Sequence, residues 1–179
     1  MNVDEHVAGK AEKIKLLILD VDGVLTDGSL FFGPQGEEYK AFNSRDGHGI
    51  KLLLKSGVEV AVITARTSVA VTARMEGLGV KHIYQGQQDK RLAFNELRAN
   101  LGLNTEECAY VGDDVIDLPV MTAVGLAIAV ADAHPFVIEH SDCTTRLPGG
   151  RGAVREVVDM ILFSQNNYRA LYQSYLEKR

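Results

Sequence analysis

Short, almost purely apolar runs recur along this chain and alternate with longer segments whose apolar residues follow helical spacing. An apolar run without polar alternation is typical of a strand that is buried on both faces of a parallel sheet. The alternation predicts an α/β fold: a doubly wound, Rossmann-like parallel sheet with right-handed crossovers. The expected strands are residues 16–19, 58–63, 82–84, 108–111 and 125–129, and the expected helices are residues 46–55, 69–77, 89–101 and 115–122.

Residues 28–43 break this alternation and are expected to form a β-hairpin insertion. Two apolar stretches flank Gly33-Pro34-Gln35-Gly36, a sequence that favours a tight turn. Isolated hairpins are marginally stable in water, so we expect this one to pack on a partner surface. A second copy of the chain and the hairpin's own domain are both open as that surface. The large apolar residues are Leu30, Phe31, Phe32, Tyr39 and Phe42.

The two ends of the chain differ in character. Residues 1–13 are polar and lack the apolar core of a signal peptide, so we expect a frayed lead-in. Residues 14–179 are expected to form a single domain. Its last part, residues 152–179, is expected to be helical with a weak point at Asn166 and Asn167.

Composition and charge narrow the class of partner. The 179 residues suffice for one domain with a real core. A formal net charge of -5 without a basic stripe argues against nucleic acid, and no apolar run is long enough to span a membrane. Cys108 and Cys143 lack the close spacing of a metal site, which favours buried thiols in a cytoplasmic protein.

Two carboxylates, Asp20 and Asp22, directly follow the first expected strand. Side chains two residues apart on an extended backbone point to the same side, and close carboxylates repel unless a cation or a shared proton relieves the charge. This arrangement suits a metal-assisted reaction in which one aspartate attacks and the other moves protons. The structural alternative is a helix N-cap followed by a glycine turn.

Further polar residues lie at the ends of later strands. Thr64 follows the second strand, Lys90 opens the helix after the third, and residues 112–117 place clustered acids after the fourth. Each alone is explained as a helix cap or a surface charge. Because the carboxyl ends of parallel strands meet at one edge of a sheet, we expect these residues to form one site.

Together these positions resemble the signatures of the haloacid dehalogenase superfamily of aspartate-nucleophile phosphotransferases. The signatures are Asp20-x-Asp22-Gly23-x-x-Thr26, Thr64, Lys90 and Gly112-Asp113-Asp114-x-x-Asp117. Residues 22–28, 42–50 and 63–66 resemble one branch, the 3-deoxy-D-manno-octulosonate 8-phosphate phosphatases, and the similarity runs from residue 15 to residue 158. The resemblance implies a phosphatase for that sugar phosphate in lipopolysaccharide precursor synthesis.

The resemblance also implies the catalytic roles. Asp20 is expected to attack phosphorus, while Asp22 gives a proton to the leaving sugar hydroxyl and takes one from the hydrolytic water. Thr64 and Lys90 are expected to bind the phosphoryl oxygens, where charge develops in the transition state.

The implied cofactor is Mg²⁺, a hard cation that prefers oxygen ligands. Its expected ligands are the side chains of Asp20 and Asp113 and the backbone carbonyl of Asp22. Asp114 and Asp117 are expected to lie behind these ligands and bind metal waters or the lysine, with Asp117 the more important of the two.

Substrate recognition requires further cations, because the implied substrate carries a carboxylate as well as a phosphate. Arg66 suits bidentate pairing with a carboxylate, and Arg74, two turns further along the same helix, is either a second such residue or an ordinary surface arginine. Residues 147–152, including Arg151, are expected to be either a lid or a plain surface loop. The resemblance implies that a polar loop lines the sugar pocket, with Asp46 also open to N-capping its helix; its residues are Asn43, Ser44, Arg45, Asp46 and Gly47.

No large cap domain is expected, so the hairpin alone is left to cover the site. An open site hydrolyses poorly, and we therefore expect a homotetramer with the hairpins packed at its centre. Two rival functions stay open: a phosphatase for a nine-carbon, sialic-acid type sugar 9-phosphate, and a non-enzymatic phospho-acceptor domain. The presence of Asp22 favours hydrolysis over the second of these.

Overall fold

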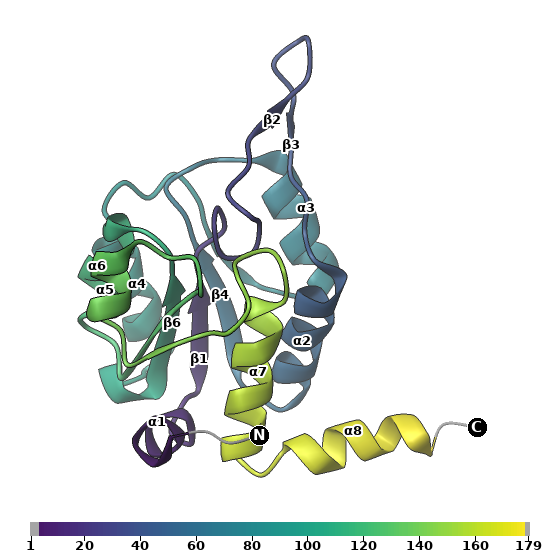
Figure 1. Cartoon of the computed structure of the whole chain (residues 1–179), viewed down its shortest axis with the longest axis vertical. Helices are drawn as coiled ribbons and strands as arrows, with labels where there is room; N and C mark the ends of the chain where they lie inside the picture. The colour runs from purple at the N-terminus through teal and green to yellow at the C-terminus, as the bar shows by residue number, and fades with distance from the viewer. Residues whose placement is uncertain (1–3, 178–179) are drawn as a thin grey trace.

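A parallel sheet of six strands forms the centre of the computed structural model, which describes residues 4–177 (Figure 1). The strand order is β5-β4-β1-β6-β7-β8, and a separate hairpin pairs β2 with β3. The strands are β1 (Leu16–Leu19), β2 (Phe31–Phe32), β3 (Glu38–Tyr39), β4 (Glu59–Ile63), β5 (His82–Tyr84), β6 (Cys108–Gly112), β7 (Leu126–Ala129) and β8 (Cys143–Thr144).

Helices cover both faces of this sheet. In Figure 1, α2, α3 and α7 lie on the right of the strands, and α4, α5 and α6 lie on the left. The predicted doubly wound α/β fold is therefore confirmed. The helices are α1 (Glu5–Ala11), α2 (Ser44–Lys55), α3 (Val69–Leu78), α4 (Lys90–Asn100), α5 (Leu118–Met121), α6 (Pro135–Glu139), α7 (Ala153–Ser164) and α8 (Tyr168–Leu176), with 3₁₀ turns η1 (Thr105–Glu107) and η2 (Val115–Asp117).

Strand β1 occupies the middle of the sheet. It pairs in parallel with β4 on one side and β6 on the other, and all four of its residues are inaccessible to solvent. Burial on both faces explains why its sequence is apolar throughout. The chain leaves β1 at Asp20, so the polar residues that follow emerge at the carboxyl edge of the sheet, between two neighbouring strands.

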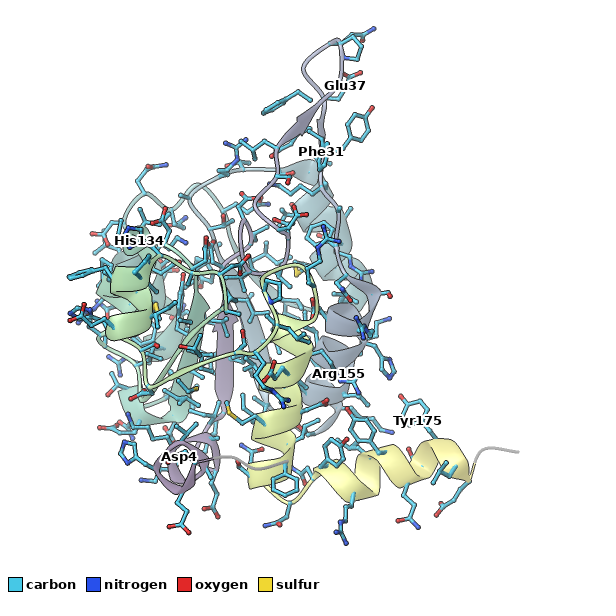
Figure 2. The ribbon with its side chains drawn as sticks, viewed as in Figure 1. Asp4, Phe31, Glu37, His134, Arg155 and Tyr175 are labelled. Atoms are coloured by element: carbon cyan, nitrogen blue, oxygen red, sulfur yellow. The ribbon has the colours of Figure 1, made fainter. Side chains whose placement is uncertain are left out.

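The hairpin projects beyond this carboxyl edge (Figure 1). Phe31, Phe32 and Tyr39 are 52%, 61% and 59% exposed, so these rings do not pack on the rest of the chain. Figure 2 shows Phe31 and Glu37 clear of the helices that cover the sheet. Of the two alternatives, packing on their own domain is therefore wrong for these three rings, although Phe42 at the base does pack against the core.

The lead-in is ordered over most of its length, contrary to the frayed segment expected from its polarity. Residues 1–3 lie outside the described residues, but Asp4 accepts hydrogen bonds from the amides of His6 and Val7 and so caps α1. Val7 and Ala11 are buried, and α1 packs against α7. The cap, the two buried residues and the ion pair between Lys10 and Asp142 together hold this short helix.

Residues 152–179 form two helices, and the break falls at the predicted weak point. Asn166 has a left-handed φ of 59° between α7 and α8, a conformation that asparagine tolerates. Helix α8 lies at the end of the molecule opposite the hairpin (Figure 1), and residues 178–179 lie outside the described residues. No helix within residues 4–177 has the length and apolarity needed to cross a bilayer.

Because β1 supports the site residues, loss of packing there should be costly. Leu17→Ala removes buried methyl groups from the central strand, so the free energy of unfolding should fall by about 2–5 kcal/mol. Leu92→Ala on α4 is the matched control; its side chain is 67% exposed, and the expected change is below about 0.5 kcal/mol. Urea unfolding measures both, and equal losses in the two variants would contradict this account of the core.

Candidate active site

The loop after β1 presents Asp20 and Asp22 at the sheet edge. The amide of Asp20 still donates to the carbonyl of Val111 in β6 at 3.1 Å, and the chain then turns sharply. The amides of residues 24, 25 and 26 all donate to the carbonyl of Val21 within 3.2 Å, which fixes the turn. The Asp20 side chain is 5% exposed and that of Asp22 is 20% exposed, so the first carboxylate lies deeper.

Gly23 allows Asp113 to approach this loop closely. Its φ of +89° lies in the left-handed region, and a Cβ atom there would lie 2.1 Å from Oδ2 of Asp113. Any other residue would therefore clash with the carboxylate as well as strain the backbone. This glycine is what lets the acid after β6 stand beside the acid after β1.

Three carboxylates gather at this point: oxygens of Asp20, Asp113 and Asp117 lie within 4.8 Å of one another. Asp117 is fully engaged, because it accepts hydrogen bonds from Lys90, Tyr110 and the backbone amide of Asp113. Oδ1 of Asp113 is buried and has no hydrogen-bond partner within the described part of the chain. Asp20 and Asp113 therefore fit a hard divalent cation, while Asp117 holds Lys90 and the backbone of Asp113 in place.

The electrostatics of this cluster also fit a cation. Burial, reinforced by the charge of Asp117, raises the pKa of Asp20 to about 6 despite the opposing Lys90 ammonium. Burial together with Asp117, Asp20 and Asp114 raises the pKa of Asp113 to about 8. Both carboxylates are thus costly to ionise, first because they are buried and then because other acids lie beside them, and a bound cation would offset this cost.

Lys90 links the two halves of the cluster. It is the first residue of α4, its side chain is 1% exposed, and its Nζ lies 2.9 Å from Asp20 Oδ1 and 2.7 Å from Asp117 Oδ1. Burial alone would lower the pKa of Lys90, but the two carboxylates outweigh it and the pKa is raised. The ammonium therefore stays charged beside Asp20.

Tyr110 is a site residue that the sequence analysis missed. Its ring is buried in β6, and its hydroxyl donates to Asp117 Oδ1 at 2.6 Å. Burial, followed by the charge of Asp117, raises its pKa well above the usual tyrosine value. A signal was available, because a buried tyrosine hydroxyl in an otherwise apolar strand needs a polar partner.

Thr64 and Asp114 occupy contrasting positions. Thr64 is buried just beyond β4; its amide donates to Tyr84 at 2.9 Å and its carbonyl accepts from Gln87 at 3.0 Å. Since β4 neighbours β1, this places Thr64 at the same edge as Asp20. Asp114 is exposed and accepts a hydrogen bond from the amide of Val115, so it caps η2 at the rim of the cluster.

A second charged cluster surrounds Asp22 at the base of the hairpin. Lys40 hydrogen-bonds Asp22 Oδ1 and lies 2.9 Å from Glu38 Oε1, although neither hairpin residue was singled out from the sequence. Arg66 Nη2 donates to Glu38 at 3.2 Å, and its Nε lies 3.7 Å from Asp22 Oδ2. The predicted carboxylate-binding arginine thus lies next to the predicted proton carrier.

Asp46 differs most from expectation among the polar-loop residues. Asn43 caps α2, whereas Asp46 is 1% exposed and accepts hydrogen bonds from the amides of Gly152 and Arg155 at the start of α7. The alternative in which Asp46 caps its own helix is therefore wrong, and these hydrogen bonds to α7 argue against a sugar contact. The sequence could not reveal the partner, because α7 begins more than a hundred residues later.

The remaining recognition residues lie in three places. Ser44 and Arg45 are exposed, while Gly47 is buried against Arg74, whose Nη2 lies 2.1 Å from where a Cβ of residue 47 would stand. Arg151 is 66% exposed and pairs with Asp27 at 2.8 Å.

The loop carrying Arg151 packs on the catalytic turn, the turn of residues 20–26 after β1 that carries the predicted catalytic residues Asp20 and Asp22. A Cβ on Gly149 would lie 1.6 Å from the carbonyl oxygen of Gly23, and the amide of Gly150 donates to Val24 at 2.9 Å.

Known proteins are similar to this chain in sequence and in fold. A family model described as haloacid dehalogenase-like hydrolase matches residues 78–155. The 3-deoxy-D-manno-octulosonate 8-phosphate phosphatase KdsC of Salmonella typhi is 56% identical over 163 residues, covering 91% of this chain and 87% of the relative. This chain belongs to the 3-deoxy-D-manno-octulosonate 8-phosphate phosphatase family. The branch that the motifs predicted is thereby confirmed.

Solved structures of the phosphatase family agree with the fold described above. The phosphatase of that name from Yersinia pestis matches with a TM-score of 0.92 at 51% identity, covering 93% of this chain and 90% of that chain. The phosphatase from Moraxella catarrhalis, solved with a magnesium ion, a phosphate ion and a KDO molecule, matches with a TM-score of 0.94 at 41% identity. That match covers 97% of this chain and 99% of that chain.

The raised carboxyl pKa values predict how Mg²⁺ affects stability across pH. Between the usual aspartate pKa and the raised values of about 6 and about 8, the metal-free folded protein holds protons that the unfolded chain has released. Its stability therefore falls as pH rises, while cation binding gains from the same deprotonation. The increase in Tm caused by Mg²⁺ should grow between about pH 5 and about pH 8 and then level off.

Thermal unfolding with Mg²⁺ and with a chelator, over this pH range, measures the effect. Asp113→Asn removes the carboxylate with the higher pKa and should flatten the pH dependence. A stabilisation by Mg²⁺ that is independent of pH in the unmodified protein would contradict the assignment of these two ligands.

Proposed function

We propose that this protein is a Mg²⁺-dependent phosphatase that hydrolyses 3-deoxy-D-manno-octulosonate 8-phosphate to 3-deoxy-D-manno-octulosonate and phosphate, a step in lipopolysaccharide precursor synthesis. The observation that carries the proposal is the buried cluster in which Lys90 bridges Asp20 and Asp117 while Asp113 stands beside them. The relatives that align with this chain over most of its length are named for this activity.

Asp20 is the proposed nucleophile. A carboxylate oxygen of Asp20 forms a bond to phosphorus while the bond from phosphorus to the sugar oxygen breaks, which leaves an aspartyl-phosphate. When bound by Asp20 and Asp113, Mg²⁺ supplies positive charge that offsets the repulsion between the carboxylates and the phosphate dianion. Lys90 keeps Asp20 ionised and oriented, and Thr64 and Lys90 offer donors to the phosphoryl oxygens.

Asp22 is the proposed proton carrier. It gives a proton to the sugar oxygen as that oxygen leaves and takes one from the water that then attacks the aspartyl-phosphate. The second half of this cycle distinguishes a hydrolase from a phospho-acceptor domain, whose aspartyl-phosphate persists. Asp22 is more exposed than Asp20, which suits exchange of protons with substrate and water.

The sugar end of the substrate is proposed to bind between the hairpin base and α2. Arg66 would pair with the substrate carboxylate, supported by its position beside Asp22. Asn43, Gly47 and Arg74 would line the wall of this region, and Arg151 would close its far side. These residues do not distinguish an eight-carbon from a nine-carbon sugar substrate, and experiment decides between the two.

Phosphate release from a panel of sugar phosphates, with Mg²⁺ present and after its removal, tests the proposal. We expect turnover of the eight-carbon sugar 8-phosphate only with Mg²⁺, and weaker turnover of a nine-carbon acid sugar 9-phosphate. Asp20→Asn should lower kcat by at least about 10³-fold, because it removes the nucleophile. Its thermal unfolding should stay close to that of the unmodified protein, and retention of activity by the folded variant would overturn the mechanism.

We also propose that the enzyme is a cytoplasmic homotetramer whose hairpins pack together at the centre. The exposed rings of Phe31, Phe32 and Tyr39 form an apolar surface that does not pack on the chain's own domain. Assembly would bury that surface and cover an active site that has no large cap. Cys108 and Cys143 are both free thiols, which suits a reducing compartment.

Sedimentation of the unmodified protein should therefore give a tetramer. Phe32→Glu places a charge on the exposed face of the hairpin and should shift the species towards smaller assemblies. Leu92→Glu introduces the same charge on the outer face of α4 and should leave the tetramer intact. An active enzyme that sediments as a monomer would refute the assembly.

A further inference from the structure

Four charged side chains form a closed ring at the base of the hairpin. Lys40 contacts Asp22 and Glu38, Glu38 contacts Arg66, and Arg66 returns to Asp22. Two of the four residues come from the second hairpin strand and the position just after it, one from the catalytic turn and one from the segment after β4. The ring therefore connects the hairpin with the proposed proton carrier.

Lys40 is the most deeply placed member of the ring. Its side chain is 1% exposed, whereas the neighbouring Tyr39 is 59% exposed. Lysine is almost never fully buried without a partner, because a desolvated ammonium is costly. Here Nζ hydrogen-bonds Asp22 Oδ1 and lies 2.9 Å from Glu38, so its charge is balanced by two carboxylates.

Glu38 fixes the geometry of this lysine. Its side chain is 15% exposed and lies within 3.2 Å of both Lys40 and Arg66. The hydrogen bond from Lys40 is the main reason that the pKa of Glu38 is lowered, so this carboxylate is ionised and able to anchor both cations. Glu38 therefore anchors the Lys40 ammonium, and the same ammonium contacts Asp22.

We propose that Lys40 is a positioning residue: it holds the Asp22 carboxyl group in the orientation from which protons pass to the leaving oxygen and from the hydrolytic water. This inference rests on the proposed function and assigns to the hairpin a part in the chemistry. A general acid must lie within hydrogen-bond reach of the oxygen that it protonates, and a small misplacement is costly. No other side chain among the described residues makes a hydrogen bond to Asp22.

Substrates with different leaving groups distinguish a positioning role of Lys40 from a merely structural one. As the bond from phosphorus to oxygen breaks, its electron pair passes to the leaving oxygen. A sugar alkoxide needs a proton from Asp22 at that moment, whereas p-nitrophenolate leaves as a stabilised anion without one. The ratio kcat/KM covers the steps up to release of the leaving group, so hydrolysis of the aspartyl-phosphate does not mask the difference.

The test compares Lys40→Met and Lys40→Arg with the unmodified protein on an alkyl sugar phosphate and on p-nitrophenyl phosphate, both with Mg²⁺. Lys40→Met should lower kcat/KM for the sugar phosphate by about 10- to 100-fold, less than the full contribution of general acid catalysis. Its kcat/KM for p-nitrophenyl phosphate should fall by less than about 3-fold, because that leaving group does not require the acid. Lys40→Arg retains a cation and should recover part of the loss.

Two further variants provide a second test of the role of Lys40 and a control. Glu38→Gln loosens the anchor of Lys40 and should give the same leaving-group selectivity with a smaller loss, which keeps the test valid if Lys40→Met folds poorly. Lys51→Met removes an exposed lysine of α2 and should leave both activities unchanged.

Equal losses on the two substrates in folded variants, or no loss on either, would overturn the role of Lys40. Failure of the proposed function appears separately. If the unmodified protein ignored the eight-carbon sugar phosphate but hydrolysed another alkyl phosphate, the substrate would be wrong, and the comparison would be made on that alkyl phosphate instead.

Discussion

The whole site depends on one buried ion pair network, in which a single lysine ammonium stands between carboxylates that would otherwise repel. Oxygens of Asp20, Asp113 and Asp117 lie within 4.8 Å of one another, and within residues 4–177 only Lys90 supplies a cation in direct contact with two of them. One ammonium cannot neutralise three ionised acids. Burial and the remaining negative charge together raise the pKa values of Asp20 and Asp113, and a divalent cation followed by a phosphate dianion is the chemistry that this site accommodates.

Such a cluster is tolerable only where the backbone fixes its members. The central strand β1 pairs with β4 and β6 along its whole length, so Asp20 leaves the sheet at a defined height between them. Gly23 has no side chain that would collide with the Asp113 carboxylate, and the hydroxyl of Tyr110 in β6 holds Asp117 by a hydrogen bond. The apolar core and the polar edge are therefore two aspects of the same strand arrangement.

This division explains what could be predicted from the sequence. Strands buried on both faces are largely apolar, so β1, β4 and β6 and the polar residues that follow them could be located from pattern alone. The contact between Asp117 and Lys90 was among those expected, whereas the partners of Asp46 and Lys40 could not be predicted, because each contact joins segments far apart in the chain or depends on which way a side chain turns. Helix α1 was missed because its two buried residues are too few to make an amphipathic pattern. Strand β8 was missed because it spans only Cys143–Thr144.

The hairpin shows how a short insertion combines two roles. Successive side chains of a strand point to opposite faces, and the chain at β3 follows this period: Glu38 and Lys40 turn inward to the charged ring, and Tyr39 between them turns outward to solvent. Apolar contacts on the outer face would restrain the same backbone that carries Lys40 towards Asp22. An insertion too small to form a cap domain thus presents an exposed apolar surface on one side and a contact with the turn that carries Asp22 on the other, and the two-residue period of the strand keeps those surfaces from competing for the same side chains.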